Sequence, residues 1–195
     1  NSLLVAIAQP IFVFFLIWMV FGNISNDAAQ DEYKNGMAIL FLLGISTFWF
    51  GCSNSAKEIV KERELYDRER NAGLSAIGYL TSKTIFLFGL TMGQAGFLFV
   101  ATVFATNLDG NPIFYALSLM AIGGCGVGLG LTISVFSPNT DVASTAVPLA
   151  IIPQVILAGM LKSLDGISEA VAWLIAPSYW CFGSLCSTWN ENWNG

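Results

Sequence analysis

The chain has 195 residues, of which 55% are hydrophobic, and its 8 basic and 13 acidic residues leave a net charge of −5. A soluble domain carries about a quarter charged residues, so an ordinary soluble domain is excluded. The chain has no histidine, which also excludes Ser-His and Cys-His nucleophiles and imidazole metal sites.

The first predicted element is a membrane-spanning helix at Leu3–Gly22. This segment has no charge and one amide, Gln9. Twenty residues at 1.5 Å each give a helix of roughly 30 Å, the thickness of the hydrocarbon core of a bilayer. A signal peptide would have a basic start and a shorter apolar core, whereas no Lys or Arg precedes Lys34. The chain begins without Met, and we expect it to be a fragment of a longer one.

Four further apolar segments are predicted to span the membrane, at residues 37–53, 84–106, 113–136 and 142–161. None of the five spans contains Asp, Glu, Lys or Arg. That absence argues against an ion-coupled pump or a cation channel, because both need charged or coordinating groups along the pathway. The predicted fold class is all-α, a polytopic helical membrane bundle formed by one transmembrane domain over residues 1–195.

Residues 55–83 carry six of the eight basic residues. Basic loops stay on the cytoplasmic side of a membrane, so this loop and the N-terminus are predicted to be cytoplasmic, in a multi-pass protein of the cell membrane. Residues 162–195 are then external, and a sixth span is expected beyond residue 195. The charged part of the loop, Lys57–Arg70, is net neutral, so nucleic acid is not expected as a partner.

The external segment holds two apolar pieces, "VAWLIA" and "WCFGSL", that are too short to span a membrane. With the tryptophans around them, they predict short re-entrant or interfacial helices. Cys181 and Cys186 are five residues apart, about 7.5 Å along a helix, which is too far for a disulfide if they share one helix.

Small residues and prolines mark three of the spans. Gly123–Gly130, "GGCGVGLG", is not followed by Lys-Ser/Thr, so we interpret it as close helix packing and not as a phosphate loop. The same packing is expected at Gly89, Gly93 and Gly96. Pro148 and Pro153 interrupt the fifth span, which predicts either a static kink or a bent, cavity-lining helix that can move.

The segment at 56–72 is predicted to be a helix standing out of the membrane. Ten of the fourteen residues in Lys57–Arg70 are charged, and Glu64 and Arg68 are spaced for an ion pair at i,i+4. Two interpretations remain open. The helix is either a salt-bridged surface element that caps the membrane, or a lever by which a cytoplasmic partner moves the second and third spans.

Four stretches resemble the transmembrane domain of ATP-binding-cassette exporters of the ABCG (White) class, within the wider type-2 exporters. They are "SAKEIVKERELYDRERNAG" after the second span, "YLTSK" at residues 79–83, "SPNTDVASTAVPLAIIPQVILAGML" at residues 137–161, and "APSYWCFGSL" at residues 176–185. The first has the family's form of acidic and basic residues followed by aromatic-x-Arg-Glu-basic.

The resemblance implies that the helix at 56–72 is a coupling helix that contacts a nucleotide-binding domain. Its docking residues would be Glu58, Glu62, Tyr66, Arg68, Glu69 and Arg70. A substrate cavity would be lined by Phe48, Trp49, Phe50, Ile151, Ile152 and Val155. Met160 and Leu161 would form a hydrophobic plug between the inner and outer cavities.

The same resemblance implies the partners. They are a nucleotide-binding domain, upstream in the same chain or separate, a second transmembrane domain in a homodimer, and the lipid bilayer. The chain has no Gly-x-x-x-x-Gly-Lys-Ser/Thr motif, so ATP and Mg would be bound by the nucleotide-binding domain. This chain alone is expected to be no enzyme and to hold no catalytic residue, cofactor or metal.

The predicted function is therefore the membrane domain of an ATP-driven exporter of an apolar or amphipathic substrate. Uncharged, aromatic-rich spans suit such a substrate, because binding would depend on burial and stacking. An ATP-independent secondary transporter or channel, or a membrane scaffold, are the alternatives.

Overall fold

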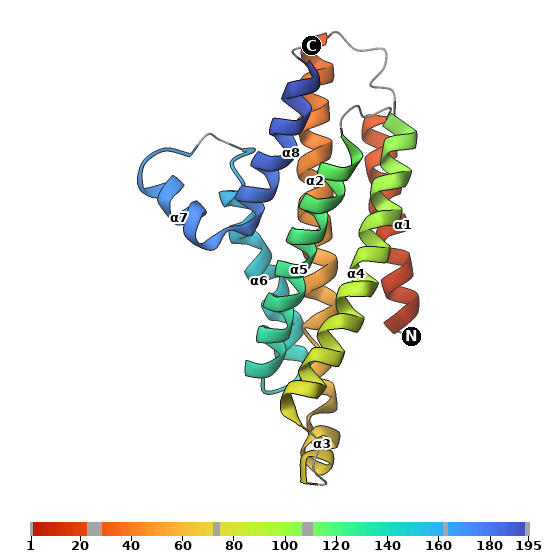
Figure 1. Cartoon of the computed structure of the whole chain (residues 1–195), viewed down its shortest axis with the longest axis vertical. Helices are drawn as coiled ribbons and strands as arrows, with labels where there is room; N and C mark the ends of the chain where they lie inside the picture. The colour runs from red at the N-terminus through yellow and green to blue at the C-terminus, as the bar shows by residue number, and fades with distance from the viewer. Residues whose placement is uncertain (1, 23–28, 72–74, 107–110, 162–163, 194–195) are drawn as a thin grey trace.

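The computed structural model describes residues 2–22, 29–71, 75–106, 111–161 and 164–193 (Figure 1). All regular secondary structure in these ranges is α-helical. Five helices are long and apolar enough to cross a membrane. The predicted fold class, an all-α polytopic membrane bundle, is confirmed.

The helices follow one another in the order in which the sequence predicts them. Their bounds are α1 Ser2–Phe21, α2 Ala29–Ser55, α3 Glu58–Asn71, α4 Ala76–Thr106, α5 Pro112–Phe136, α6 Thr140–Leu157, α7 Ile167–Ile175 and α8 Pro177–Trp193. Three limits differ from the expected spans by several residues. Helix α2 begins eight residues before Met37, α4 begins eight residues before Thr84, and α6 ends four residues before Leu161.

Helix α2 lies at the centre of the bundle and packs most extensively against α5. Small residues permit this contact. A methyl group added to Gly51 would lie 2.6 Å from the backbone oxygen of Gly123, and one added to Gly130 would lie 2.5 Å from that of Cys52. Backbones this close leave no room for a Cβ. The predicted packing role is confirmed for this part of the glycine run.

The glycines of α4 behave differently. A Cβ added to Gly89, Gly93 or Gly96 would meet no atom within 4 Å. The prediction that these residues bring helices close together is therefore wrong within the protomer. Gly89 and Gly93 line a pocket between α4 and α1, which runs next to α4 (Figure 1).

Pro10 lies inside α1 and cannot donate the helical hydrogen bond that the carbonyl of Ala6 would otherwise accept. The side-chain nitrogen of Gln94, on α4, donates to that carbonyl instead. The side-chain oxygen of Gln94 accepts a hydrogen bond of 2.6 Å from Asn54 of α2. A polar group freed in an apolar bundle is thus satisfied by a neighbouring helix, as the membrane interior requires.

Helix α6 leads into a bent pair of helices. Gly159 (φ +85°) and Gly166 (φ +60°) adopt the left-handed conformation between α6 and α7, which glycine tolerates best. Helices α7 and α8 meet at 96°, as a re-entrant pair or one broken span. Helix α8 is longer than the apolar piece that predicted it, and it packs against α2 and α5.

Gln154 holds this bend in place. It is only 5% exposed; its side-chain nitrogen donates to the carbonyl of Ile175 at 3.2 Å. The hydroxyl of Ser178 donates to the backbone and side-chain oxygens of Gln154, at 2.7 and 3.0 Å. The residues on both sides of the α7–α8 bend are therefore tied to one side chain of α6.

Candidate functional site

Helix α3 stands at one end of the bundle, where α2 ends and α4 begins (Figure 1). It carries its acidic Glu58 in the first turn and basic Arg68 and Arg70 in the last turn, the arrangement that the helix dipole favours. Its hydrophobic content is low compared with every other helix, so its attachment to the bundle depends on specific polar contacts.

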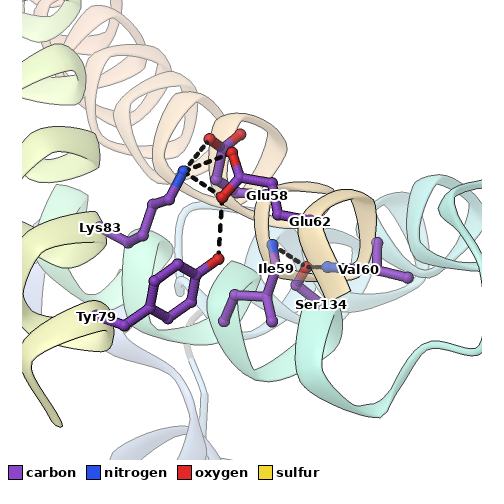
Figure 2. A network of polar contacts seen from close by, with 7 residues as sticks. All are labelled: Glu58, Ile59, Val60, Glu62, Tyr79, Lys83 and Ser134. Carbon is purple, nitrogen blue, oxygen red and sulfur yellow. Dashed lines mark hydrogen bonds and ion pairs between the residues drawn. The ribbon is translucent and has the colours of Figure 1, made fainter. Parts of the chain in front are cut away.

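The N-terminal turn of α3 is bound by a side chain of α5. The hydroxyl oxygen of Ser134 accepts hydrogen bonds from the backbone N–H groups of Ile59, at 2.9 Å, and Val60, at 3.0 Å (Figure 2). Ser134 is fully buried. The first N–H groups of a helix have no intrahelical partners. Here a side chain about 75 positions away in sequence accepts their hydrogen bonds, as an N-cap residue usually does.

The contact is reciprocal, because Arg63 of α3 binds the C-terminal end of α5. Its guanidinium donates to the carbonyl oxygens of Val135, at 3.0 Å, and Ser137, at 2.9 Å. These carbonyls lie at or just beyond the last turn of α5, where the helix dipole is negative and the carbonyls lack helical partners. The start of α3 and the end of α5 therefore satisfy each other's free backbone groups.

On its other side, α3 is joined to α4 by an ion-pair network (Figure 2). The ammonium nitrogen of Lys83 lies 2.9 Å from the carboxylate of Glu58 and 2.7 Å from that of Glu62. The hydroxyl of Tyr79 donates to Glu62 at 3.0 Å. These side chains are partly buried, which reduces the solvent screening of their charges.

The network favours the ionised form of Glu62. Partial burial works to raise the pKa of this carboxyl. The hydrogen bonds from Lys83 and Tyr79 and the positive charge of Lys83 outweigh that effect, and the pKa lies below its usual value of 4.5. At neutral pH Glu62 is thus held ionised beside the ammonium group of Lys83.

Past this network, α3 makes one described ring contact and then ends in an exposed tip. The ring of Tyr66 packs on that of Tyr79, with ring centres 4.8 Å apart. Arg68, Glu69 and Arg70 are exposed. The predicted Glu64–Arg68 ion pair is wrong, since the described ion pairs of α3 go to Lys83 on α4. Among the described side chains, the tip of α3 therefore presents exposed charges of both signs, at Arg68, Glu69 and Arg70.

The six predicted coupling residues fall into two groups. Glu58, Glu62 and Tyr66 face α4 and hold α3 in place, while Arg68, Glu69 and Arg70 face outward. Neither Ser134 nor Arg63 is among the contact residues predicted from the sequence. A serine near the end of an apolar span gives no signal that its partner lies on another helix.

The six predicted cavity residues are also divided. Phe48 and Phe50 are at most 1% exposed and belong to the core between α2 and α5. Trp49 is 48% exposed, on another side of the same helix. On α6, Ile152 is exposed and Ile151 and Val155 are half-buried. Helix α6 packs beside α2, and of the six predicted residues the exposed ones are Trp49 and Ile152.

The two predicted plug residues follow α6. Met160 is half-buried and Leu161 is 69% exposed. They come directly after Gly159, whose backbone has a left-handed conformation (φ +85°) just past the end of α6.

All four cysteines are free thiols. Within the described ranges, no group of His, Cys, Asp and Glu side chains is arranged to hold a metal ion.

Comparison with known proteins agrees with this arrangement. The profile of the family described as "ABC-2 type transporter" matches residues 1–189. The ABC transporter ATP-binding/permease protein Rv1747 of Mycobacterium tuberculosis (strain ATCC 25618 / H37Rv) is 21% identical over 183 residues. That match covers 86% of this chain and 20% of the relative, so the chain spans about a fifth of the relative's length.

Proposed function

The chain belongs to the ABC-2 type transporter family as the membrane domain of an ABC transporter, and we propose that it forms the substrate pathway of an ATP-driven exporter. The chain is a permease component of a multi-pass membrane protein. ATP and Mg would be bound by a nucleotide-binding domain, which the printed name of the mycobacterial relative supports as a partner. The full assembly would hydrolyse ATP.

The observation that carries the proposal is the way α3 is mounted. Its N-terminal half is bound to α5 through Ser134 and Arg63 and to α4 through Lys83. Its tip, Arg68 to Arg70, projects free. A helix held at one end and open at the other can transmit a push on its tip to the two helices that hold it. We assign the α3 end to the cytoplasm, where the nucleotide-binding domain would dock.

The substrate class follows from the surface shared by α2 and α6. Trp49, Ile151, Ile152 and Val155 offer apolar side chains without a charge, which favours an apolar or amphipathic substrate bound by burial and stacking. Two copies of the domain facing each other across this surface would enclose the pathway. Met160 and Leu161 would close it toward the other end.

Site-specific crosslinking tests the docking role. A photoreactive amino acid at position 69 in the full-length transporter, in native membranes, is expected to capture the nucleotide-binding domain. The matched control is position 113, an exposed residue at the opposite end of the bundle, which should not capture it. Efficient activation at position 69 without an ATPase adduct would overturn the docking role and favour the ATP-independent transporter.

A charge reversal tests the coupling. Arg68→Glu together with Arg70→Glu should leave membrane insertion unchanged and reduce substrate-stimulated ATPase activity and transport by about tenfold or more, since both side chains lie in the proposed interface. Lys34→Glu, also exposed but on the other end of α2, is the control. Transport at the wild-type rate by the double variant would contradict the lever.

A further inference from the structure

We propose that the groove between α1 and α4 is a binding site for an anionic glycerophospholipid from the membrane leaflet at the α3 end. The site is made of two adjoining pockets, a polar one beside α3 and an apolar one farther along α4. The apolar pocket is lined by α1 and α4 alone, whereas the polar pocket also touches the end of α2 at Ser53 and Asn54 and the first residue of α6, Thr140.

The polar pocket has a volume of about 420 Å³, within the usual range for small-molecule sites. Its rim carries Lys57 and Lys61, which are exposed. Glu58 also lines it, but its carboxylate is paired with Lys83. The rim therefore has two cations without an ion-pair partner in the described structure, at the level where the charged α3 meets the apolar spans.

Gln9 lines the same pocket, and its side-chain oxygen is buried without a hydrogen-bond partner among the described residues. A buried acceptor left unsatisfied costs about 1–3 kcal/mol. A small rotation of the Gln9 side chain would open this oxygen to the pocket, where a hydroxyl donor on a bound head group would remove the cost. The pocket thus offers cations for a phosphate and an acceptor for a hydroxyl.

The apolar pocket, about 400 Å³, adjoins the polar one through the two residues that both share, Ala6 and Leu90. Its walls include Ile7 and Ile11 of α1 and Phe97 of α4. A polar end that leads into an apolar groove matches the head and the chain of one amphipathic lipid. A free phosphate would use only the first pocket.

Two glycines of α4, Gly89 and Gly93, form the open side of this groove. Gly89 and Gly93 line it, and a Cβ at either position would meet no atom within 4 Å. Glycine is a poor helix former, and here it serves no close helix contact within the protomer. The absence of side chains at these two positions keeps the groove wide enough for an acyl chain.

The test uses the full-length transporter in nanodiscs that contain phosphatidylglycerol with a photoreactive group in its acyl chain. Adducts are located by mass spectrometry of peptides. We expect adducts on the groove residues to exceed those on exposed Val135 and Phe136 of α5, which lie at the same end. Excess unlabelled phosphatidylglycerol should compete for the groove, and phosphatidylcholine should compete several-fold less.

Two pairs of variants separate the pockets. Gly93→Leu fills the groove and should abolish the groove adducts, whereas Gly96→Leu, equally open but outside the groove, should not. Lys57→Gln with Lys61→Gln should reduce the preference for phosphatidylglycerol by roughly fivefold per lysine, whereas Lys34→Gln should leave it unchanged.

Equal groove labelling in Gly93→Leu, or equal competition by both lipids, would overturn the proposal. So would a photoreactive residue at position 7 that captures a segment of polypeptide in place of lipid. No step of this test requires ATP, so it can fail while the exporter function stands. The exporter function can likewise fail while lipid binding stands.

Discussion

Ser134 of α5 accepts the backbone hydrogen bond of Ile59, the second residue of α3. The pair lies 75 positions apart in sequence, and it makes a residue of the candidate span α5 part of the cap of the charged helix α3. The start of α3 therefore cannot move without α5.

Replacing Ser134 with alanine tests this anchor. The change leaves the N–H groups of Ile59 and Val60 without their acceptor and should cost about 1–2 kcal/mol. Hydrogen exchange of the backbone amides at the start of α3 should accelerate by about fivefold or more. Thr132→Ala is the control, because its exposed hydroxyl bonds only to Gly128 of its own helix. Unchanged exchange in Ser134→Ala would remove the capping role.

Loss of Lys83 should destabilise the junction of α3 and α4. In Lys83→Met the carboxylates of Glu58 and Glu62 lose their shared cation and repel each other, at a cost of about 1–2 kcal/mol for partly exposed groups. The free energy of unfolding can be measured by SDS titration in mixed micelles. We expect stability to be restored when Glu58→Gln and Glu62→Gln are added to Lys83→Met, because the triple variant has no uncompensated charges at this junction.

The same junction should respond to acid. The pKa of Glu62 is lower in the folded chain than its usual 4.5, so the ionised form stabilises the fold. That contribution is complete above the unfolded pKa and is lost as the pH falls through the lower folded value. Wild type should therefore be more stable than Glu62→Gln at pH 7, and the difference should shrink below about pH 4.5. A difference that grows in acid would contradict the assignment.

Gln154 should control the bend between α7 and α8. In Gln154→Leu the carbonyl of Ile175 and the backbone N–H of Ser178 lose their side-chain partner, at a cost of about 1 kcal/mol for each hydrogen bond in a membrane setting. The hydroxyl of Ser178 keeps its hydrogen bond to the backbone oxygen of residue 154. Amide exchange in peptides that cover Ile175 and Ser178 should accelerate. Thr145→Val, also on α6 but bonded only within its own helix, should not change it.

Two neighbouring glycines should respond in opposite ways to alanine. A Cβ at Gly126 would overlap the backbone oxygen of Phe48 on α2, so Gly126→Ala should destabilise the bundle by about 1–3 kcal/mol through overpacking. A Cβ at Gly128 would meet nothing within 4 Å. Gly128→Ala should be neutral or stabilising by about 0.5–1 kcal/mol, because alanine favours the helix. SDS titration of both variants distinguishes them, and equal effects would refute the α2–α5 contact.

Composition alone predicts the fold class and singles out the charged helix. Long uncharged apolar runs have few stable conformations other than helices in a membrane, because every backbone polar group must be satisfied within the segment. The dense charge of Lys57–Arg70 predicts a segment outside the membrane for a different reason, because charged side chains are costly to transfer into hydrocarbon. Both conclusions depend only on the average composition of a segment, which can be counted from the sequence.

Tertiary structure decided what individual residues do. The patterns of Gly89-xxx-Gly93 and Gly126-xxx-Gly130 look alike, yet one lines an open groove and the other packs on α2. Phe48 and Trp49 are adjacent, yet one is in the core and the other is exposed. The partners of Ser134 and Gln154 lie on other helices. Apolar side chains surround a membrane helix on all sides, so its sequence does not mark which face meets protein and which meets lipid, and only the packing of the helices assigns them.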